Sequence, residues 1–351
     1  MQAAEERKCN LKDLTLSELE DFVLALGEPT FRAKQIFAWL YKGVRSFSEM
    51  TNLSKPLRER LARCANVGAL EIEQKFISHI DETRRYLLKL GDGNYIESVL
   101  MRYHHGYTIC VSSQVGCAMG CSFCASTRAG KIRSLSCGEI LDQIVTVQRD
   151  LGERISNIVM MGIGEPLDNY DAVLKFLRIV QDKNGLYIGH RHITLSTCGL
   201  ADRIRDLAEE ELQITLSVSL HAAEDAQRSA LMPVNRRYPI AAVLDACRYY
   251  IEKTNRRVSF EYTLIQGVND TDRDAERLAA LLRGLLCHVN LIPVNEVRES
   301  GFRASVRERV YRFQQRLEAA GISATVRREM GADIQAACGQ LRYQKIAASE
   351  T

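Results

Sequence analysis

The stretch CVSSQVGCAMGCSFCAST, residues 110–127, holds four cysteines but no charged residue and no histidine. Three of these cysteines, Cys117, Cys121 and Cys124, form a C-x3-C-x2-C spacing. A zinc site normally takes four ligands, and neither a second cysteine pair nor a histidine follows nearby. Three thiolates suit a cubane iron–sulfur cluster better, since they leave one of its four irons open to bind something else. The alternative is that these are structural cysteines, packed as small apolar residues at a chance spacing.

The composition is that of an ordinary globular protein, with 351 residues, 46% of them hydrophobic and 26% charged. The first residues, MQAAEERKCN, contain no apolar run typical of a signal peptide, and no stretch of about 18 apolar residues follows. We therefore expect a cytoplasmic protein that does not enter the membrane. In that reducing setting, 11 cysteines at irregular spacing favour metal binding or thiol chemistry over a disulfide framework. The net charge of +3 allows an anionic partner but does not require one.

From about Tyr107 onward, short apolar runs alternate with segments of helical periodicity, which predicts a parallel sheet built from βα units. The expected strands are residues 108–113, 156–162, 192–197, 213–220, 258–265, 289–295 and 323–329. Helices are expected between them, for example at residues 139–151, 170–181, 239–253, 274–285 and 306–320. Six such units and a last strand are fewer than the eight that close a full barrel. The predicted fold class is therefore α/β, an open, partial (βα)6 barrel.

The residues before the barrel read as helices and then as a β-meander. The segment TLSELEDFVLALG begins with Thr15 as a helix cap, has Glu18 three residues later and ends at Gly27. The basic residues of this region form either an RNA-facing surface or a solvated one. They are Arg32, Lys34, Lys42, Arg45, Lys55, Arg58, Arg60 and Arg63. The meander is expected at residues 72–80, 83–91 and 94–103.

We divide the chain into four parts. They are a helical accessory domain, which is assigned to RNA binding if its basic residues form an RNA-facing surface, a β-meander extension, the partial barrel and a C-terminal tail. Their boundaries are residues 1–66, 67–105, 106–330 and 331–351, respectively.

Polar residues follow several of the expected strands, where the active sites of such barrels lie. Each has an ordinary structural interpretation as a turn, a helix cap, a satisfied core group or a loop residue. Together they indicate a site at this end of the sheet. They are Gly164 and Glu165 after the second strand, Ser196 after the third, Ser219 and His221 after the fourth, and Asn295 after the sixth.

The segments GEPL, SLHA, LMPVN, LIPVN and ACGQL occur in this order together with the cysteine triplet, between about residues 94 and 342. This combination resembles the RlmN/Cfr family of radical S-adenosylmethionine RNA methyltransferases, and its RlmN branch more than Cfr. One departure is CASTRAGKIR, where many members continue CATG after the third cysteine; this changes the loop but not the ligands. The resemblance implies a 4Fe–4S cluster on Cys117, Cys121 and Cys124, whose open iron chelates S-adenosylmethionine. It also implies cofactor contacts from Gly164, Glu165, Ser196, Ser219, Leu220, His221 and Asn295.

The activity that the resemblance implies is methylation of carbon 2 of an adenosine in 23S rRNA, and of the adenosine beside the anticodon in some tRNAs. Carbon 2 is electron-poor and does not attack the methyl group of S-adenosylmethionine, whereas a thiolate does. In the family pattern Cys338 accepts that methyl group, and a second S-adenosylmethionine provides the radical that removes one of its hydrogens. Glu97 then takes the carbon 2 proton, and Cys110 releases the product by forming a disulfide with Cys338.

From the residues alone, Cys110 as a packed strand residue and Glu97 as an outward residue of a strand are the preferred interpretations; the resemblance reverses this preference. The other cysteines, Cys9, Cys64, Cys137, Cys198, Cys247 and Cys287, are assigned to packing or chance. The assignment of Cys198 is the least secure, because it lies close to Ser196.

To reach carbon 2 the adenine must leave its stack, so we expect recognition of loop or single-stranded RNA. Basic candidates for that contact are Arg128, Lys131, Arg133, Arg236, Arg237, Arg298 and Arg303. A one-electron donor such as flavodoxin or ferredoxin is a further expected partner. Three alternatives stay open, namely methylation at adenine carbon 8 as in Cfr, a non-catalytic metal-stabilised RNA-binding protein, and a radical enzyme such as a glycyl-radical activase.

Overall fold

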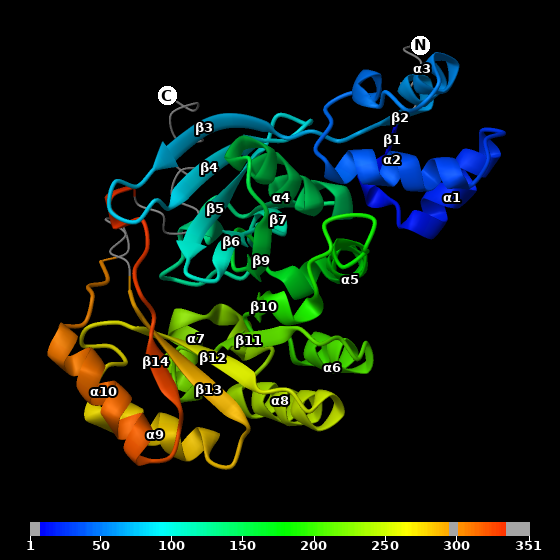
Figure 1. The fold of residues 1–351 in the computed structure, drawn as a ribbon. Coiled ribbons are helices and arrows are strands. Elements are labelled where there is room, and N and C mark those ends of the chain that lie inside the picture. Colours follow the sequence, from blue (N-terminus) through cyan, green and yellow to red (C-terminus); the bar gives the residue numbers. More distant parts are fainter. Residues whose placement is uncertain (1–7, 295–300, 335–351) are drawn as a thin grey trace, which may run out of the picture.

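A single curved sheet of ten strands organises the protein (Figure 1). The computed structural model describes residues 8–294 and 301–334. The strand order is β14-β13-β12-β11-β10-β9-β6-β5-β4-β3. The bounds are β3 (Glu71–Ile77), β4 (Arg84–Lys89), β5 (Tyr95–Tyr103), β6 (Gly106–Cys110), β9 (Ile155–Met160), β10 (Ile193–Thr197), β11 (Thr215–Ser219), β12 (Val258–Leu264), β13 (Cys287–Pro293) and β14 (Ala324–Val326).

The seven strands from β6 to β14 pair in parallel, which confirms the expected partial barrel. Their apolar residues, such as Ile109, Ile158 and Val218, are fully buried, as a parallel sheet covered by helices requires. The meander β3–β6 is antiparallel and continues the same sheet, because β6 pairs with β5 on one side and β9 on the other. The sheet therefore has two edges within the described residues, β14 and β3.

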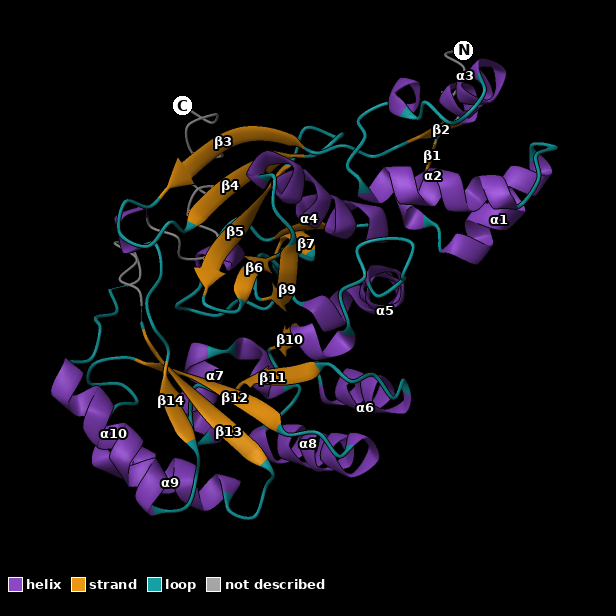
Figure 2. Ribbon diagram, in the orientation of Figure 1, coloured by secondary structure: helices purple, strands orange, loops and turns teal. Residues whose placement is uncertain are grey.

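Helices follow the parallel strands, and most lie along the outside of the curve (Figure 2). These are α4 (Cys137–Leu151), α5 (Tyr170–Val180), α6 (Ala201–Glu209), α8 (Ile240–Thr254), α9 (Asp272–Leu282) and α10 (Arg307–Ala319). The short α7 (Asp225–Leu231) instead contacts the cysteine loop, where the Ser122 amide donates to the Leu231 carbonyl. In α4 the residues Ile140, Ile144 and Val147 recur at helical spacing and are fully buried, so one face of the helix packs into the core. No helix in the described ranges has the length and apolar character needed to cross a membrane.

The N-terminal helices are α1 (Leu16–Ala25), α2 (Phe31–Tyr41) and α3 (Lys55–Cys64), with a small parallel pair, β1 (Cys9–Asn10) and β2 (Ala65–Asn66). The expected cap is confirmed: Thr15 and Glu18 form a reciprocal capping box at the start of α1. Short 3-10 turns occur at Leu11–Asp13, Phe47–Glu49, Ala125–Thr127, Pro166–Asn169, His190–His192, Pro233–Arg236 and Ala332–Ile334.

This helical region is joined to the barrel through α4. Lys12 and Asp142 form an ion pair whose side chains are each only 2% exposed. Lys12 also donates to the carbonyl of Gly68 at 3.1 Å, and the Gly138 amide donates to Asp13 at 2.6 Å. Because Gly138 is in the first turn of α4, Asp13 satisfies a backbone donor that the helix leaves without an internal partner.

Candidate active site

A cavity of about 270 Å³ opens where the parallel strands end, at the carboxyl edge of the sheet. Its walls come from the cysteine loop, the loop after β9 and the ends of β10 to β14. The three cysteines of the C-x3-C-x2-C spacing all line it. So do five of the residues expected to contact the cofactor, Gly164, Glu165, Ser196, Ser219 and His221.

A two-stranded hairpin that the sequence did not predict carries the cysteine loop. It consists of β7 (Gln114–Gly116) and β8 (Lys131–Ser134). Gly116 has φ +80°, and a Cβ atom there would collide with the carbonyl oxygen of Gly130. Only glycine allows the strands to close at this point. The loop is therefore fixed at its base, and its three cysteines line the cavity.

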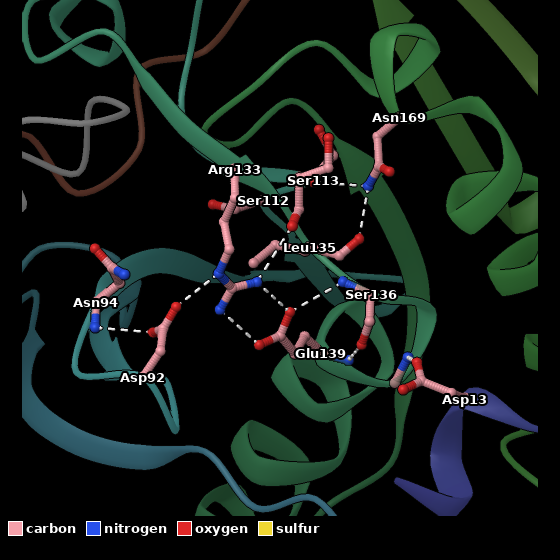
Figure 3. A network of polar contacts seen from close by, with 12 residues as sticks. Asp13, Asp92, Asn94, Ser112, Ser113, Arg133, Leu135, Ser136, Glu139 and Asn169 are labelled. Atoms are coloured by element: carbon pink, nitrogen blue, oxygen red, sulfur yellow. Dashed lines mark hydrogen bonds and ion pairs between the residues drawn. The ribbon is translucent and has the colours of Figure 1, made fainter. Parts of the chain in front are cut away.

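The hairpin is fixed to its surroundings by a network of polar contacts around Arg133 (Figure 3). Arg133 binds Glu139 at the start of α4 at 2.7 Å and Asp92 of the β4–β5 turn at 2.6 Å. Burial opposes the charge on Asp92, but hydrogen bonds from Arg133 and Asn94 outweigh it and bring the pKa of Asp92 to about 2. The Asn169 amide group, on the other side, donates to the carbonyl of Ser113 at 3.0 Å.

The thiols fit a multi-iron cluster better than a single ion. Burial raises the pKa of Cys117 to about 12, and burial together with the neighbouring cysteine charges raises the pKa of Cys121 further. Such thiols become thiolates when a metal coordinates them. Among the described residues, no three His, Cys, Asp or Glu side chains converge on a point that would hold one metal ion. A cubane cluster does not need this convergence, because each cysteine binds a different iron.

Glu165 follows β9 and is held by the backbone around it. Its carboxylate accepts hydrogen bonds from the amides of Leu167 at 3.0 Å and Cys198 at 2.7 Å. Burial raises its pKa, and these hydrogen bonds oppose that rise. Gly164 has φ +109°, and a Cβ atom there would lie 2.6 Å from the Cβ of Gln114. A glycine is thus required for the turn that places Glu165 in the cavity wall.

His221 adopts φ +57°, a left-handed conformation that is uncommon for histidine. Its Nδ1 accepts a hydrogen bond from the Thr263 amide at 2.9 Å, so Nε2 carries the proton of the neutral ring. Burial, aided by the charge of Arg228, lowers the pKa of His221 to about 3. The ring packs edge-on against Phe123 of the cysteine loop at 4.9 Å.

Four expected cofactor residues differ in placement from the prediction or escape description. Ser196 lies inside β10 and Ser219 is the last residue of β11, so neither follows its strand, although both line the cavity. Leu220 is fully buried and is not part of the cavity wall; its amide donates to the Glu261 carbonyl at 3.0 Å. Asn295 lies outside the described residues.

Glu97 and Cys110 lie together on one face of the sheet, beside the cavity. Val99 pairs with Cys110 across β5 and β6, and Glu97 is two residues before Val99, so the side chains of Glu97 and Cys110 share a face. Burial raises the pKa of Cys110 to about 11, while the charge of Arg327 and the Met161 amide oppose the rise. Arg327 and Met161 both line the cavity. The pair is therefore next to the cysteine site without being in its wall.

Glu97 is only 4% exposed and is paired with Arg85, which is 2% exposed, at 3.1 Å. The same guanidinium donates to the backbone carbonyl of Ile334 at 3.1 Å. Ile334 is the last residue that the structure describes, and Cys338 lies outside the described residues.

Several site residues were not predicted. Cys198, which the sequence assigned to packing, lines the cavity and binds Glu165 through its amide. Arg228 is fully buried and donates to the carbonyls of Cys198, Ser219 and Leu220, so it holds two of the strand-end loops together. For Cys198, the sequence offered one indication of a role in the site, its position two residues after Ser196. For Arg228, which lies on α7, the sequence offered no indication.

The basic candidates for RNA contact separate into two groups. Arg133 and Lys131 are engaged in ion pairs, the latter with Asp168 at 2.6 Å. Arg128, Arg236, Arg237 and Arg303 are exposed, although Arg237 also pairs with Asp202 at 3.8 Å, and Arg298 lies outside the described residues. In the N-terminal region Arg60 pairs with Glu28, whereas the exposed residues are Lys34, Lys42, Arg45, Lys55 and Arg63, of which Lys55 also pairs with Glu59 at 3.9 Å.

Comparisons with known proteins agree with this geometry. The family profile "Ribosomal RNA large subunit methyltransferase N-terminal domain" matches residues 9–67, and "Radical SAM superfamily" matches residues 111–282. A protein named probable dual-specificity RNA methyltransferase RlmN from Alkaliphilus oremlandii is 58% identical over 97% of this chain and 99% of its own. A protein of the same name from Clostridium perfringens is 56% identical over 96% of this chain and 97% of its own. The crystal structure of a radical SAM methyltransferase from Sphaerobacter thermophilus superposes with a TM-score of 0.91 at 49% identity, covering 95% of this chain and 98% of that chain.

Proposed function

Because this chain belongs to the RlmN family of radical S-adenosylmethionine RNA methyltransferases, we propose that it methylates carbon 2 of an adenosine in 23S rRNA. We extend the proposal to the adenosine beside the anticodon of some tRNAs, in line with the dual specificity in the relatives' names. Such an enzyme would act in the cytoplasm and would take its electron from a flavodoxin or a ferredoxin.

Cys117, Cys121 and Cys124 would hold the 4Fe–4S cluster, and the cavity beside them would receive S-adenosylmethionine. When bound, the cluster and S-adenosylmethionine together would supply the chemistry that removes a hydrogen atom from an unreactive C–H bond. The chain shapes the space for it. Glu165 and the neutral His221 present polar groups to the cavity from loops that backbone hydrogen bonds hold in place.

Cys338 is proposed as the first acceptor of the methyl group. Carbon 2 of adenine lies between two ring nitrogens and is a poor nucleophile, whereas a thiolate accepts a methyl group by displacement. Cys338 lies four residues after Ile334, and four residues of chain span at most about 14 Å. Ile334 is bound to Arg85, the partner of Glu97, so the tail begins next to the proposed proton acceptor.

Glu97 and Cys110 would complete the reaction once the methylene carbon has bonded to adenine. Glu97 takes the proton from carbon 2, and the unpaired electron of the adduct leaves to a one-electron acceptor such as the oxidised form of the proposed flavodoxin or ferredoxin, which restores the aromatic ring. The Cys110 thiolate attacks the Cys338 sulfur, so an S–S bond forms as the S–C bond breaks; the electron pair of that bond stays on the carbon, which takes up one proton and becomes the methyl group. The shared sheet face of Glu97 and Cys110 beside the three-cysteine cavity is the observation that carries this proposal.

RNA recognition is assigned to exposed basic residues on two parts of the chain. Arg128, Arg236 and Arg303 are exposed and lie on the cysteine loop and on segments that follow barrel strands. The N-terminal region adds Lys34, Lys42, Arg45, Lys55 and Arg63, which would bind phosphates without reading sequence.

Nucleoside mass spectrometry of RNA treated with the anaerobically reconstituted enzyme tests the function. We expect 2-methyladenosine in 23S rRNA transcripts. The isomer 8-methyladenosine would assign the chain to the Cfr-type reaction. A protein that binds RNA but cleaves no S-adenosylmethionine would overturn the proposal in favour of a metal-stabilised RNA-binding protein.

A further inference from the structure

The segment after β14 crosses from one edge of the sheet to the other. β14 is the edge strand at one end and β3 is the edge strand at the other. Figure 1 shows the red segment leaving β14 and rising to the turn between β3 and β4. This segment leads directly into the tail that carries Cys338, so its attachment bears on where the tail starts.

Three hydrogen bonds hold the segment to the β3–β4 turn, and a fourth lies within the turn. Asp333 accepts from the Ser78 hydroxyl at 2.7 Å and from the His79 amide at 2.9 Å. The Gly331 amide donates to Asp81 at 2.8 Å. Within the turn, the Ser78 hydroxyl also accepts from the amide of Asp81 at 3.3 Å. We call these five residues, Ser78, His79, Asp81, Gly331 and Asp333, the tail latch.

Both carboxylates of the latch are suited to this task. Hydrogen bonds from Ser78 and from the His79 amide lower the pKa of Asp333. Burial raises the pKa of Asp81, but hydrogen bonds from the Gly331 and Thr83 groups outweigh it and lower the pKa. Both are therefore charged at neutral pH, and hydrogen bonds to charged acceptors are stronger than those between neutral groups.

Arg85 links the latch to the proposed proton acceptor. It is the second residue of β4, close after the turn, and its guanidinium contacts both Glu97 and the Ile334 carbonyl. Ile334, the residue after Asp333, thus shares the Arg85 guanidinium with Glu97. If the latch contacts are lost, the hydrogen bond from Arg85 to the Ile334 carbonyl still holds the start of the tail, but the three hydrogen bonds that join residues 331 and 333 to the turn are gone.

We propose that Ser78, Asp81 and Asp333 are positioning residues that fix the start of the tail and thereby bring Cys338 to the cofactor cavity and to Cys110. The inference rests on the proposed role of Cys338. The latch does not touch the cavity, so cofactor binding and cleavage do not depend on it. A tail held at its base samples fewer arrangements, and this raises the frequency of the reactive one.

Asp333→Ala is the test variant, with Glu329→Ala as its matched control. Both residues are exposed and acidic in the same segment, and the described part of the chain shows no hydrogen bond or ion pair for Glu329. Ser78→Ala and the double variant complete a mutant cycle. Three readouts apply, namely hydrogen exchange of peptides covering residues 78–83 and 329–334, the rate of methyl transfer to Cys338 without RNA, and S-adenosylmethionine cleavage.

For Asp333→Ala we expect faster exchange in both peptides and methyl transfer to Cys338 slowed by about tenfold, with cofactor cleavage at the wild-type rate. Ser78→Ala should slow transfer in the same direction, and the double variant should be no slower than Asp333→Ala, since the two residues share one contact. Asp333→Glu should restore part of the rate.

Exchange and transfer rates in Asp333→Ala equal to those in Glu329→Ala would overturn the latch. Fully additive single effects would also contradict it, because they would mean that Ser78 and Asp333 act independently. If wild-type Cys338 gains no methyl group, the proposed function fails, and the exchange of the two peptides alone decides whether the latch exists.

Discussion

At the residue scale, burial sets the protonation of the groups around the cavity. Burial raises the pKa of Cys110 to about 11, so its thiol loses a proton less readily than an ordinary cysteine, although the charge of Arg327 and the Met161 amide oppose this shift. His221 is neutral because its pKa is lowered to about 3. The resting site thus holds uncharged groups at both positions.

Replacing Cys110 with alanine should trap the enzyme on its substrate. The variant can still methylate Cys338 and bond the methylene carbon to adenine. It lacks the Cys110 thiolate that would break the carbon–sulfur bond between Cys338 and the product. Denaturing electrophoresis after one turnover should show a protein–RNA band that ribonuclease removes. Cys287→Ala, at another part-buried strand cysteine, serves as the control and should release its product. If Cys110→Ala turns over normally, the release step passes to another thiol, with Cys198 first because it lines the cavity.

The buried His221 should make the fold less stable in mild acid. Its folded pKa of about 3 lies below the ordinary histidine pKa of 6.5, so the unfolded chain binds a proton that the folded chain does not. This contribution is complete above pH 6.5 and is lost as pH falls toward 3, by up to about 1.4 kcal/mol per pH unit. Asparagine tolerates the left-handed backbone and retains an acceptor, so His221→Asn is the suitable variant.

Urea unfolding of the cluster-free protein between pH 7.5 and 5.5 measures this effect. The free energy of unfolding should fall less steeply with decreasing pH in His221→Asn than in the wild type. Equal slopes would show that His221 is already protonated in the fold, or that it is exposed.

At the scale of the elements, strands and helices were predictable where they repeat a buried pattern. In the parallel strands β12 and β13 apolar residues recur at alternate positions, and each strand is followed by a segment of helical period, which is a strong local signal. The hairpin β7–β8 was not predictable, because its two short strands are separated by the 14 residues of the cysteine loop and pair across its base, where Gly116 is opposite Lys131. The tail latch escapes sequence reasoning for another reason: Ser78 and Asp333 are 255 residues apart.

The hairpin gives a prediction about cluster assembly. In Gly116→Ala the new Cβ collides with the Gly130 carbonyl, so the base of the cysteine loop must open. Gly130→Ala is the control, since it also has a positive φ of +64° but has open space around the new Cβ. After anaerobic reconstitution, Gly116→Ala should bind well under half the iron of the wild type, with Gly130→Ala above it. Equal iron content in the two variants would mean that the hairpin does not position the ligands.

At the scale of the whole molecule, the helical region and the barrel form one packed unit. The buried pair of Lys12 and Asp142 and the contact of Asp13 with α4 join them. The exposed basic residues of the N-terminal helices are thus held in a fixed position relative to the cavity. An RNA that contacts this region would be held at a set distance from the cysteine loop, and recognition and chemistry become geometrically linked.

Breaking the buried pair should loosen this union. Lys12→Met leaves the Asp142 carboxylate buried without its cation, which costs about 3–5 kcal/mol of unfolding free energy. Adding Asp142→Leu removes the buried charge and should recover part of that loss. Denaturant unfolding of the two variants measures both values. If Lys12→Met were as stable as the wild type, the Lys12–Asp142 pair would not join the helical region to the barrel.

The central claim is that the methyl group passes through Cys338 on its way to RNA, and a chase experiment tests it most directly. Enzyme given S-adenosylmethionine without RNA should gain about 14 Da on the tail peptide, one methyl replacing hydrogen. When RNA is added, that mass should disappear as 2-methyladenosine appears in equal amount, and Cys338→Ala should form neither product. Methylated RNA from Cys338→Ala, or from wild-type enzyme whose tail peptide never gains mass, would contradict the claim.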